Sequence, residues 1–249
     1  MAKLIIQIPC YNEEATLGIA LRELPRSVPG FDRVEWLIIN DGSKDRTIEV
    51  AKSFGVDHIV DLHYNRGLAR AFSAGLDACL ALGADVIVNT DADNQYQASD
   101  IPRLTKPILS GDADMVIGAR PILSIDEFSP LKKLLQRLGS WVVRSISGAD
   151  VADAPSGFRA ISRDLALRLK VFNGYTYTLE TIIQASMSGA RILSVPIRVN
   201  GKLRESRLMR SIPQYIRASL ITMFRIYILY RPFRVFTFLS FLPLLFGSI

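Results

Sequence analysis

Residues 85–95 read DVIVNTDADNQ, in which a short apolar run is followed at once by two aspartates one residue apart. An apolar run of this length bounded by polar residues is typical of a strand that is buried on both faces. Such strands occur in parallel sheets that helices cover on both sides. The segment therefore predicts a central strand over residues 85–89, with Asp91 and Asp93 just beyond its carboxyl end.

Apolar strands alternate with helical segments on both sides of this stretch. The expected strands are residues 4–9, 36–39, 58–61 and 115–118. The expected helices are residues 13–24, 45–54 and 67–82. This alternation predicts an α/β fold with a mostly parallel sheet and helices on both faces. With 249 residues and 49% hydrophobic content, the chain can bury one substantial core.

Polar clusters follow the carboxyl ends of three of these strands. They are PCYNE at 9–13, NDGS at 40–43 and DAD at 91–93. In open α/β sheets, ligands bind in the crevice beyond the carboxyl ends of the strands. We therefore expect the three clusters to converge on one crevice.

The acidic pair is a candidate metal site. Asp91 and Asp93 can hold Mg²⁺ or Mn²⁺, and the amide oxygen of Gln95 is a plausible third ligand. Such an ion keeps positions open for a diphosphate and neutralises the charge that develops on a leaving nucleotide diphosphate. The alternative is an Asp-rich turn before a helix that Ser99 or Asp100 would cap.

The other two clusters and the start of the 67–82 helix fit a nucleotide. Asp41 can accept hydrogen bonds from a base or a ribose, and Gly42 would let the nucleotide approach the backbone. Glu13 would accept from ribose or cap the first helix, and Arg66 or Arg70 would reach phosphate. Ordinary turns and an exposed helix start are the alternatives. The expected nucleotide-binding residues are Pro9, Tyr11, Glu13, Asp41, Arg66, Asp91 and Ala92.

These motifs occur in the order seen in family 2 glycosyltransferases. Together with N-x-G-x-A-x-A-x-x-x-G at 65–75 and G-x-R at 118–120, they make the chain resemble that family over residues 4 to about 210. The resemblance implies the Rossmann-like GT-A fold. Within the family, the chain most resembles the polyprenyl-phosphate (dolichyl-phosphate) mannose or glucose synthases. That likeness lies in residues 91–95, 156–159, 195–197 and 205–208.

The resemblance implies inverting, metal-dependent transfer of a sugar from a UDP- or GDP-linked donor to a polyprenyl phosphate. A phosphate acceptor is already anionic and needs cations more than a base. The expected catalytic residues are Asp91, Asp93, Arg120 and Arg159. The expected acceptor-phosphate residues are Lys202, Arg204, Ser206 and Arg207. The branch usually ends in Ser-Lys after an Arg and a Gly, so this chain departs from the pattern there. A basic segment that simply meets a membrane is the alternative.

Two other functions remain open at this stage. One is transfer to a hydroxyl of a lipid-linked glycan or other cell-surface glycan precursor, which needs a base, and Glu180 or Asp153 are the candidates. The other is a non-catalytic binding module that retains the fold. The net charge of +6 suits polyanions or an anionic membrane. A nucleic-acid partner is not expected, because no nucleic-acid-binding module is recognisable.

The C-terminal part of the chain points to a membrane. The expected division is a catalytic domain over 1–210, amphipathic membrane-interface helices over 211–234, and a hydrophobic segment over 235–249. The last segment is expected to be a truncated transmembrane helix whose basic flank places the domain on the cytoplasmic face, and a re-entrant or interfacial hairpin around Pro243 is the alternative. Residues 130–147 form another basic amphipathic helix, expected on a membrane surface or packed on the sheet. Cys10 and Cys79 are expected to be buried, reduced thiols.

Overall fold

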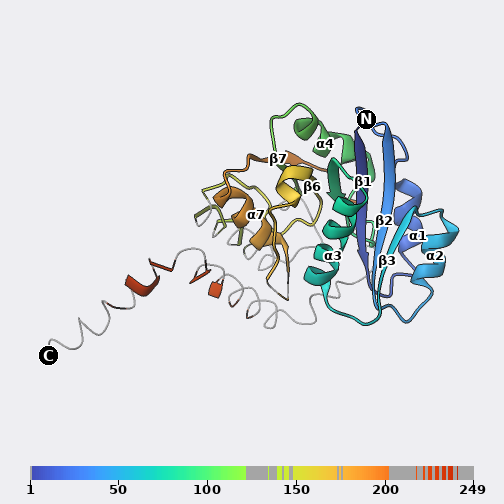
Figure 1. Cartoon of the computed structure of the whole chain (residues 1–249), viewed down its shortest axis with the longest axis horizontal. Coiled ribbons are helices and arrows are strands. Elements are labelled where there is room, and N and C mark those ends of the chain that lie inside the picture. Colours follow the sequence, from blue (N-terminus) through green and yellow to red (C-terminus); the bar gives the residue numbers. More distant parts are fainter. Residues whose placement is uncertain are drawn as a thin grey trace. The chain divides into compact units, whose positions relative to one another are not determined.

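The computed structural model describes residues 2–121, 148–172, 174 and 176–201, with scattered helical positions between 134 and 145 and between 217 and 240 (Figure 1). The chain divides into two compact units, Met1–Glu205 and Ser206–Ile249. The predicted domain boundary at residue 210 and the end of the chain from 241 lie outside the described residues. All of the sheet belongs to the first unit.

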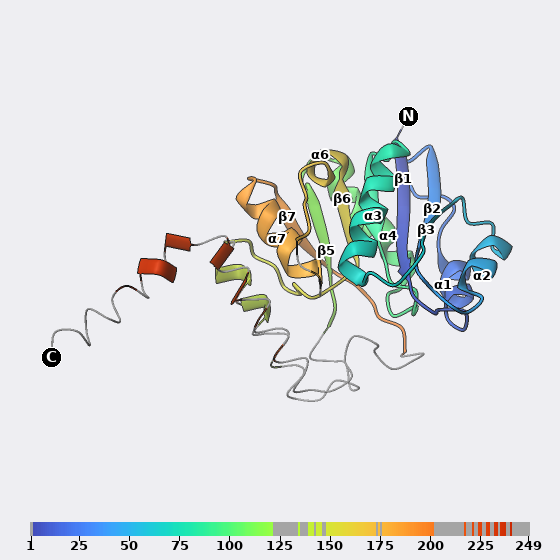
Figure 2. The same ribbon diagram turned by 60° about the horizontal axis from the view of Figure 1, so that its bottom comes forward.

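The first unit is built on a seven-stranded sheet with the order β3-β2-β1-β4-β6-β5-β7 (Figure 2). Its strands are β1 (Lys3–Cys10), β2 (Arg33–Asp41), β3 (His58–Leu62), β4 (Val86–Asn89), β5 (Met115–Ala119), β6 (Arg159–Ser162) and β7 (Ile192–Pro196). Every strand pairing is parallel except those of β6, which runs antiparallel to both β4 and β5. The predicted mostly parallel α/β fold is confirmed.

Helices cover both faces of this sheet, as the apolar strands require. The helices are α1 (Leu17–Glu23), α2 (Thr47–Ser53), α3 (Leu68–Ala81), α4 (Ile101–Leu109), α6 (Arg163–Ala166) and α7 (Thr178–Met187). On one face, Ile6 of β1 belongs to a core cluster with Leu17 of α1 and Leu104 of α4. On the other face, α3 approaches so closely that a Cβ at Gly75 would lie 2.4 Å from Gln7 Oε1. Side chains fill the space between these layers, so β4 is buried along its whole length.

The sequence did not predict β6, β7, α6 or α7. β6 is four residues long, and an arginine and a serine stand at its ends, so it lacks the apolar run that marked the other strands. It exists because β4 and β5 leave a place between them, where Asn89 pairs with Arg159. The antiparallel direction of β6 brings the residues before it, 156–158, beside the carboxyl end of β4. This strand therefore delivers a distant motif to the acidic pair.

The predicted amphipathic helix over 130–147 is helical at its described positions, but two residues of its expected apolar face are exposed. Leu134 and Trp141 on that face are 62% and 58% exposed. Ser140 and Val143, from another face, are buried instead. Packing against the rest of the unit therefore uses small residues and leaves a leucine and a tryptophan at the surface.

The predicted membrane segment is not confirmed. Of the helices in the described part of the chain, none has the length and hydrophobicity that crossing a membrane requires. The described positions between 217 and 240 are helical, and the division into interface helices over 211–234 and a hydrophobic segment over 235–249 stays a prediction. Cys10 and Cys79 are both buried thiols, as predicted. Burial also raises the pKa of the Cys79 thiol.

Candidate active site

The first two polar clusters are fastened to one another, as the sequence predicted. The backbone N–H of Asn12 donates to Ser43 Oγ at 2.9 Å, and the Asn12 side chain accepts from the N–H of Lys44 at 2.8 Å. Asn12 adopts a positive φ of 54°, a conformation that asparagine tolerates better than most residues. The N–H of Glu13 donates to Thr47 Oγ1 at 2.8 Å. The loops after β1 and β2 therefore form one rigid edge.

The carboxylates of Glu13 and Asp45 also stabilise these two loops by accepting hydrogen bonds inside them. Glu13 is buried and accepts a 2.6 Å hydrogen bond from the hydroxyl of Thr16, the residue before α1. Of the two expected uses of Glu13, the structure shows the one at the helix start. Burial would raise the pKa of Asp45, but hydrogen bonds from Thr47 and from the N–H of Glu14 lower it overall. Asp45 therefore stays ionised and holds the two loops together.

Asp41 is also turned inward and bonds to the backbone before α3. Its Oδ1 accepts from the N–H of Arg66 at 2.7 Å, and its Oδ2 accepts from the N–H of Gly67 at 2.9 Å. The carboxylate is buried. Asp41 thus ties the loop before α3 to the end of β2, and its contact with a nucleotide stays a prediction.

Gly42 has a different purpose from the one expected. It has a φ of +69°, and a Cβ there would lie 2.5 Å from the carbonyl carbon of Tyr64 and 2.6 Å from the nitrogen of Asn65. The group that requires a glycine at this position is therefore the protein's own backbone, since any Cβ would clash with it. Gly42 permits the loop after β3 to approach the loop after β2, which brings Arg66 to this edge of the sheet.

Replacing Gly42 by alanine is expected to destabilise the protein by about 3 kcal/mol, because a strained φ and a backbone clash add together. Gly111 is the matched control, since it has a φ of +76° with no atom within 4 Å of a built Cβ. Gly111→Ala should cost only the strain of the left-handed conformation, about 1 kcal/mol. Urea unfolding of both variants measures the difference. Equal losses would contradict the close-approach explanation.

Aromatic and basic side chains stand exposed beside this edge. The Arg66 guanidinium lies 4.5 Å from the centroid of the Tyr64 ring, and it donates to Tyr64 Oη at 2.8 Å. Tyr64 is 62% exposed and Tyr11 is 36% exposed. Tyr64 was not among the residues chosen from the sequence, because it stands in a polar loop with no recognisable motif. A cation and two aromatic rings at this place fit a base or a phosphate.

The acidic pair lies just beyond β4, where the sequence placed it. Asp91 and Asp93 are partly exposed, whereas Ala92 between them is buried. Asp93 Oδ1 accepts from the N–H of Gln95 at 3.2 Å, and the intervening Asn94 adopts a φ of 55°. A Cβ at Gly157 would stand 3.2 and 3.3 Å from the two carboxylate oxygens of Asp91. The turn therefore presents two carboxylates at the edge where the other loops end.

This donor set fits a divalent cation. Within the described part of the chain, no three His, Cys, Asp or Glu side chains gather as a metal cluster. Two carboxylates and a neutral amide are few ligands for Mg²⁺ or Mn²⁺, ions that commonly complete their shell with water and substrate phosphate oxygens. Partial exposure of both aspartates leaves room for such oxygens.

Arg120 and Asp153 form a buried pair close to the acidic turn. Arg120 Nε donates to Asp153 Oδ2 at 2.6 Å, and the second guanidinium bond to Oδ1 measures 3.0 Å. The side chains are 9% and 1% exposed. Both carboxylate oxygens of Asp153 are occupied by this fork, so the geometry argues against a catalytic base there. A direct catalytic role for Arg120 stays a prediction.

Arg159 was expected to be catalytic, and its surroundings correct that expectation. The side chain is completely buried, and its guanidinium donates to the carbonyl oxygens of Ser156 and Thr178 and to Thr181 Oγ1. Burial lowers the pKa of this guanidinium. Arg159 therefore joins the loop before β6 to the start of α7.

The other base candidate, Glu180, also points inward. It is 1% exposed, and its carboxylate accepts from the N–H of Phe172 at 3.2 Å. The predicted acceptor residues Lys202, Arg204, Ser206 and Arg207 lie outside the described residues. The segment that leads to them begins at the acidic turn, since the N–H of Asn200 donates to the carbonyl of Gln95 at 2.9 Å.

The family model that matches this chain, and two relatives that match it, are those of sugar transferases. The model of the family described as Glycosyl transferase family 2 matches residues 5–168. An undecaprenyl-phosphate mannosyltransferase of Micrococcus luteus is 31% identical, over 81% of this chain and 85% of the relative. A UDP-N-acetylglucosamine–dolichyl-phosphate N-acetylglucosaminyltransferase of Methanococcus voltae is 30% identical, over 77% and 83% of the two chains.

Among solved structures, glucosyl-3-phosphoglycerate synthase from Mycobacterium tuberculosis has a similar fold. Its complex with Mn²⁺, uridine diphosphate and glucosyl-3-phosphoglycerate superimposes with a TM-score of 0.67. The match covers 89% of this chain and 80% of that one, at 19% identity. At that identity the likeness shows the fold alone.

Proposed function

The chain belongs to glycosyl transferase family 2 and is a glycosyltransferase, and from this premise we propose that it transfers a sugar, with inversion, to a polyprenyl phosphate. The donor would be a UDP- or GDP-linked sugar. The observation that carries the proposal is the acidic turn, Asp91 and Asp93, placed at the one edge of the sheet where the loops after β1, β2 and β3 are tied together. A donor can thus be held at both its nucleotide and its diphosphate.

Asp91 and Asp93, with Gln95, are the residues that would hold Mg²⁺ or Mn²⁺. When bound there, the ion supplies charge neutralisation for the departing nucleotide diphosphate. The fit of the donor set supports this, and so does the fold's likeness to an enzyme crystallised with Mn²⁺ and uridine diphosphate. Tyr11, Tyr64 and Arg66 would orient the nucleotide from the neighbouring loops.

A phosphate acceptor fits this chain better than a hydroxyl acceptor, because the two candidate bases are engaged elsewhere and a basic segment follows the acidic turn. Transfer to a hydroxyl needs a base near the sugar, yet Asp153 is occupied by Arg120 and Glu180 faces inward. A phosphate needs cations, and the basic segment that holds Lys202, Arg204 and Arg207 follows directly on Asn200 at the acidic turn. Two relatives named for undecaprenyl phosphate and dolichyl phosphate support the same class of acceptor.

Such an acceptor would place the enzyme at the cytoplasmic face of a membrane. Leu134, Trp141 and Arg144 are exposed and lie in the stretch 130–147, and this combination is typical of a helix on a membrane surface. The basic residues Arg225, Arg231 and Arg234 precede the uncharged end of the chain. Basic flanks of this kind lie on the cytoplasmic side of membranes.

A donor and acceptor panel tests the proposal. The full chain is incubated with labelled UDP-glucose, UDP-N-acetylglucosamine or GDP-mannose, with Mn²⁺, and with undecaprenyl or dolichyl phosphate in detergent. We expect one donor to give a lipid-linked product whose anomeric configuration by NMR is opposite to that of the donor. Chelation by EDTA should stop the reaction. Transfer only to glycosylated lipids would support the hydroxyl acceptor, and nucleotide binding without turnover would indicate a binding module.

A further inference from the structure

A buried polar network lies directly beneath the acidic turn. Asn89, the last residue of β4, is completely buried and donates from Nδ2 to Tyr177 Oη at 2.8 Å and to the carbonyl of Gly157 at 2.9 Å. Its Oδ1 accepts from Gln7 Nε2 on β1 at 3.0 Å. A buried polar group without a partner is costly, so every member of this network constrains the others.

Gly157 is the point where this network reaches the carboxylate of Asp91. A Cβ at Gly157 would lie 3.1 Å from Tyr177 Oη and 3.2 Å from Asp91 Oδ1. The N–H of Gly157 donates to Tyr96 Oη at 3.1 Å, so this residue is held through both its N–H and its carbonyl. The Gly157 backbone thus lies between the buried Tyr177 and the carboxylate of Asp91.

Tyr177 is itself held rigidly. It is 1% exposed, and its ring stacks on Phe72 of α3 with the centroids 3.7 Å apart and the planes 2° apart. Burial, and then the charge of Asp91, raise the pKa of the Tyr177 hydroxyl, which therefore stays protonated. In that form Oη accepts from Asn89 and donates to the Gly157 carbonyl at 3.4 Å. Because the ring and the hydroxyl of Tyr177 are both fixed, they set the position of the Gly157 carbonyl.

We propose that Tyr177 is a positioning residue for the metal-binding carboxylate of Asp91 and acts through the Gly157 backbone. The inference rests on the proposed function. Without the hydroxyl, Asn89 Nδ2 would keep the Gly157 carbonyl as its only acceptor, and that carbonyl would lose a donor. The Gly157 backbone would shift, and the Asp91 carboxylate, which lies beside this backbone, would change its position. Groups that orient a metal ligand affect metal affinity without touching the metal.

The test measures Mn²⁺ binding without turnover. Free Mn²⁺ is followed by electron paramagnetic resonance as the full chain is titrated in the presence of UDP. Tyr177→Phe is expected to raise the Kd for Mn²⁺ about tenfold, the range seen for residues that orient metal ligands. UDP affinity measured without a metal should not change. Thr105→Val is the control, because it removes a buried hydroxyl that bonds only within α4.

Gly157→Ala provides a second variant if Tyr177→Phe does not fold. Its Cβ would press on Tyr177 Oη and Asp91 together, so it too should weaken Mn²⁺ binding. Unchanged Mn²⁺ affinity in either folded variant, with normal binding by the wild type, would overturn the positioning role. Equal weakening in Thr105→Val would also overturn it, since the effect would then be a general loss of stability. Absence of UDP-dependent Mn²⁺ binding in the wild type would instead overturn the proposed function.

Discussion

Replacing Asp93 by alanine is expected to lower the rate of sugar transfer at least about a thousandfold, a loss typical of removing a main source of charge stabilisation. Asp93 is one of the two carboxylates that the acidic turn presents, and both are partly exposed at the crevice. With one carboxylate removed, the site would keep only Asp91 and neutral oxygens. Transfer assays over a range of Mn²⁺ concentrations measure the effect.

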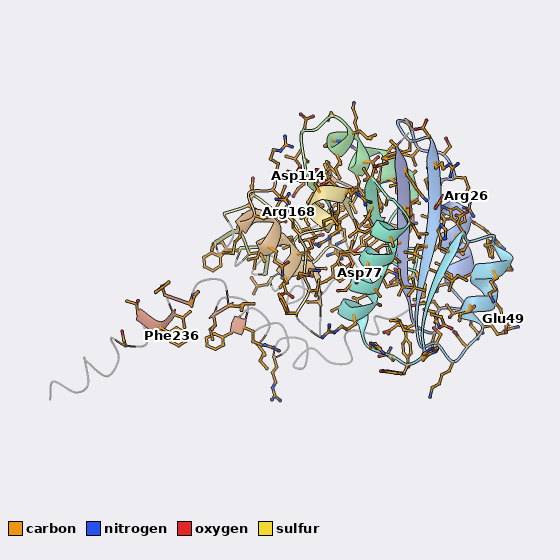
Figure 3. All side chains as sticks on the ribbon, in the orientation of Figure 1. Arg26, Glu49, Asp77, Asp114, Arg168 and Phe236 are labelled. Atoms are coloured by element: carbon orange, nitrogen blue, oxygen red, sulfur yellow. The ribbon has the colours of Figure 1, made fainter. Side chains whose placement is uncertain are left out.

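The fold should survive this change. Asp93 is partly exposed, and its Oδ1 accepts a backbone bond from Gln95, so its loss should cost about 1 kcal/mol of stability. Asp77→Ala is the matched control, since Asp77 is an exposed aspartate on α3 (Figure 3). It should leave both the rate and the Mn²⁺ dependence unchanged. Wild-type rates in Asp93→Ala would refute the metal-dependent mechanism.

The largest loss of stability is expected from Asp153→Asn. The change leaves the Arg120 guanidinium buried without its carboxylate, and breaking such a pair costs about 3–5 kcal/mol. The replacement amide keeps the shape of the side chain, so the loss reports charge and hydrogen bonding rather than a cavity. Thermal unfolding followed by circular dichroism measures the fall in Tm.

This variant also separates two views of Asp153. A catalytic base would lose activity on mutation without a comparable fall in Tm, whereas a structural partner of Arg120 would lose stability first. Glu14→Gln is the control, because it makes the same chemical change in an exposed pair with Arg46, where solvent screens the charges. Its Tm should barely change. A stable, folded and inactive Asp153→Asn protein would revive transfer to a hydroxyl.

The strands of the first half of the chain and the acidic turn were predictable for local reasons. β1, β2 and β4 carry apolar runs that burial on both faces explains, and β4 is buried throughout. Parallel strands end at the same edge of a sheet, so polar clusters after them had to converge. The bond between Asn12 and Ser43 confirms that the first two clusters meet, and the bond between Asp41 and Arg66 adds the loop before α3 to the same edge.

The second half was predicted less well because its order depends on distant partners. β6 has no alternating or continuous apolar pattern of useful length, and it is a strand because β4 and β5 flank it. Its antiparallel insertion carries Gly157 to Asp91, a contact between residues far apart in the sequence. Tyr177 gave no signal either, since one tyrosine in a polar segment has no period or spacing.

The sequence alone determined which residue types stand at the crevice edge: two aspartates after the central strand, with polar loops beside them. Only the tertiary structure decided which of these groups are exposed and which are buried and hydrogen-bonded to the protein itself. Asp41, Glu13 and Arg159 look like ligand-binding residues in the sequence, yet each is buried and bonded to the protein. The reason is physical, because a buried charged side chain needs hydrogen-bond partners, and those partners come from loops that only folding brings together.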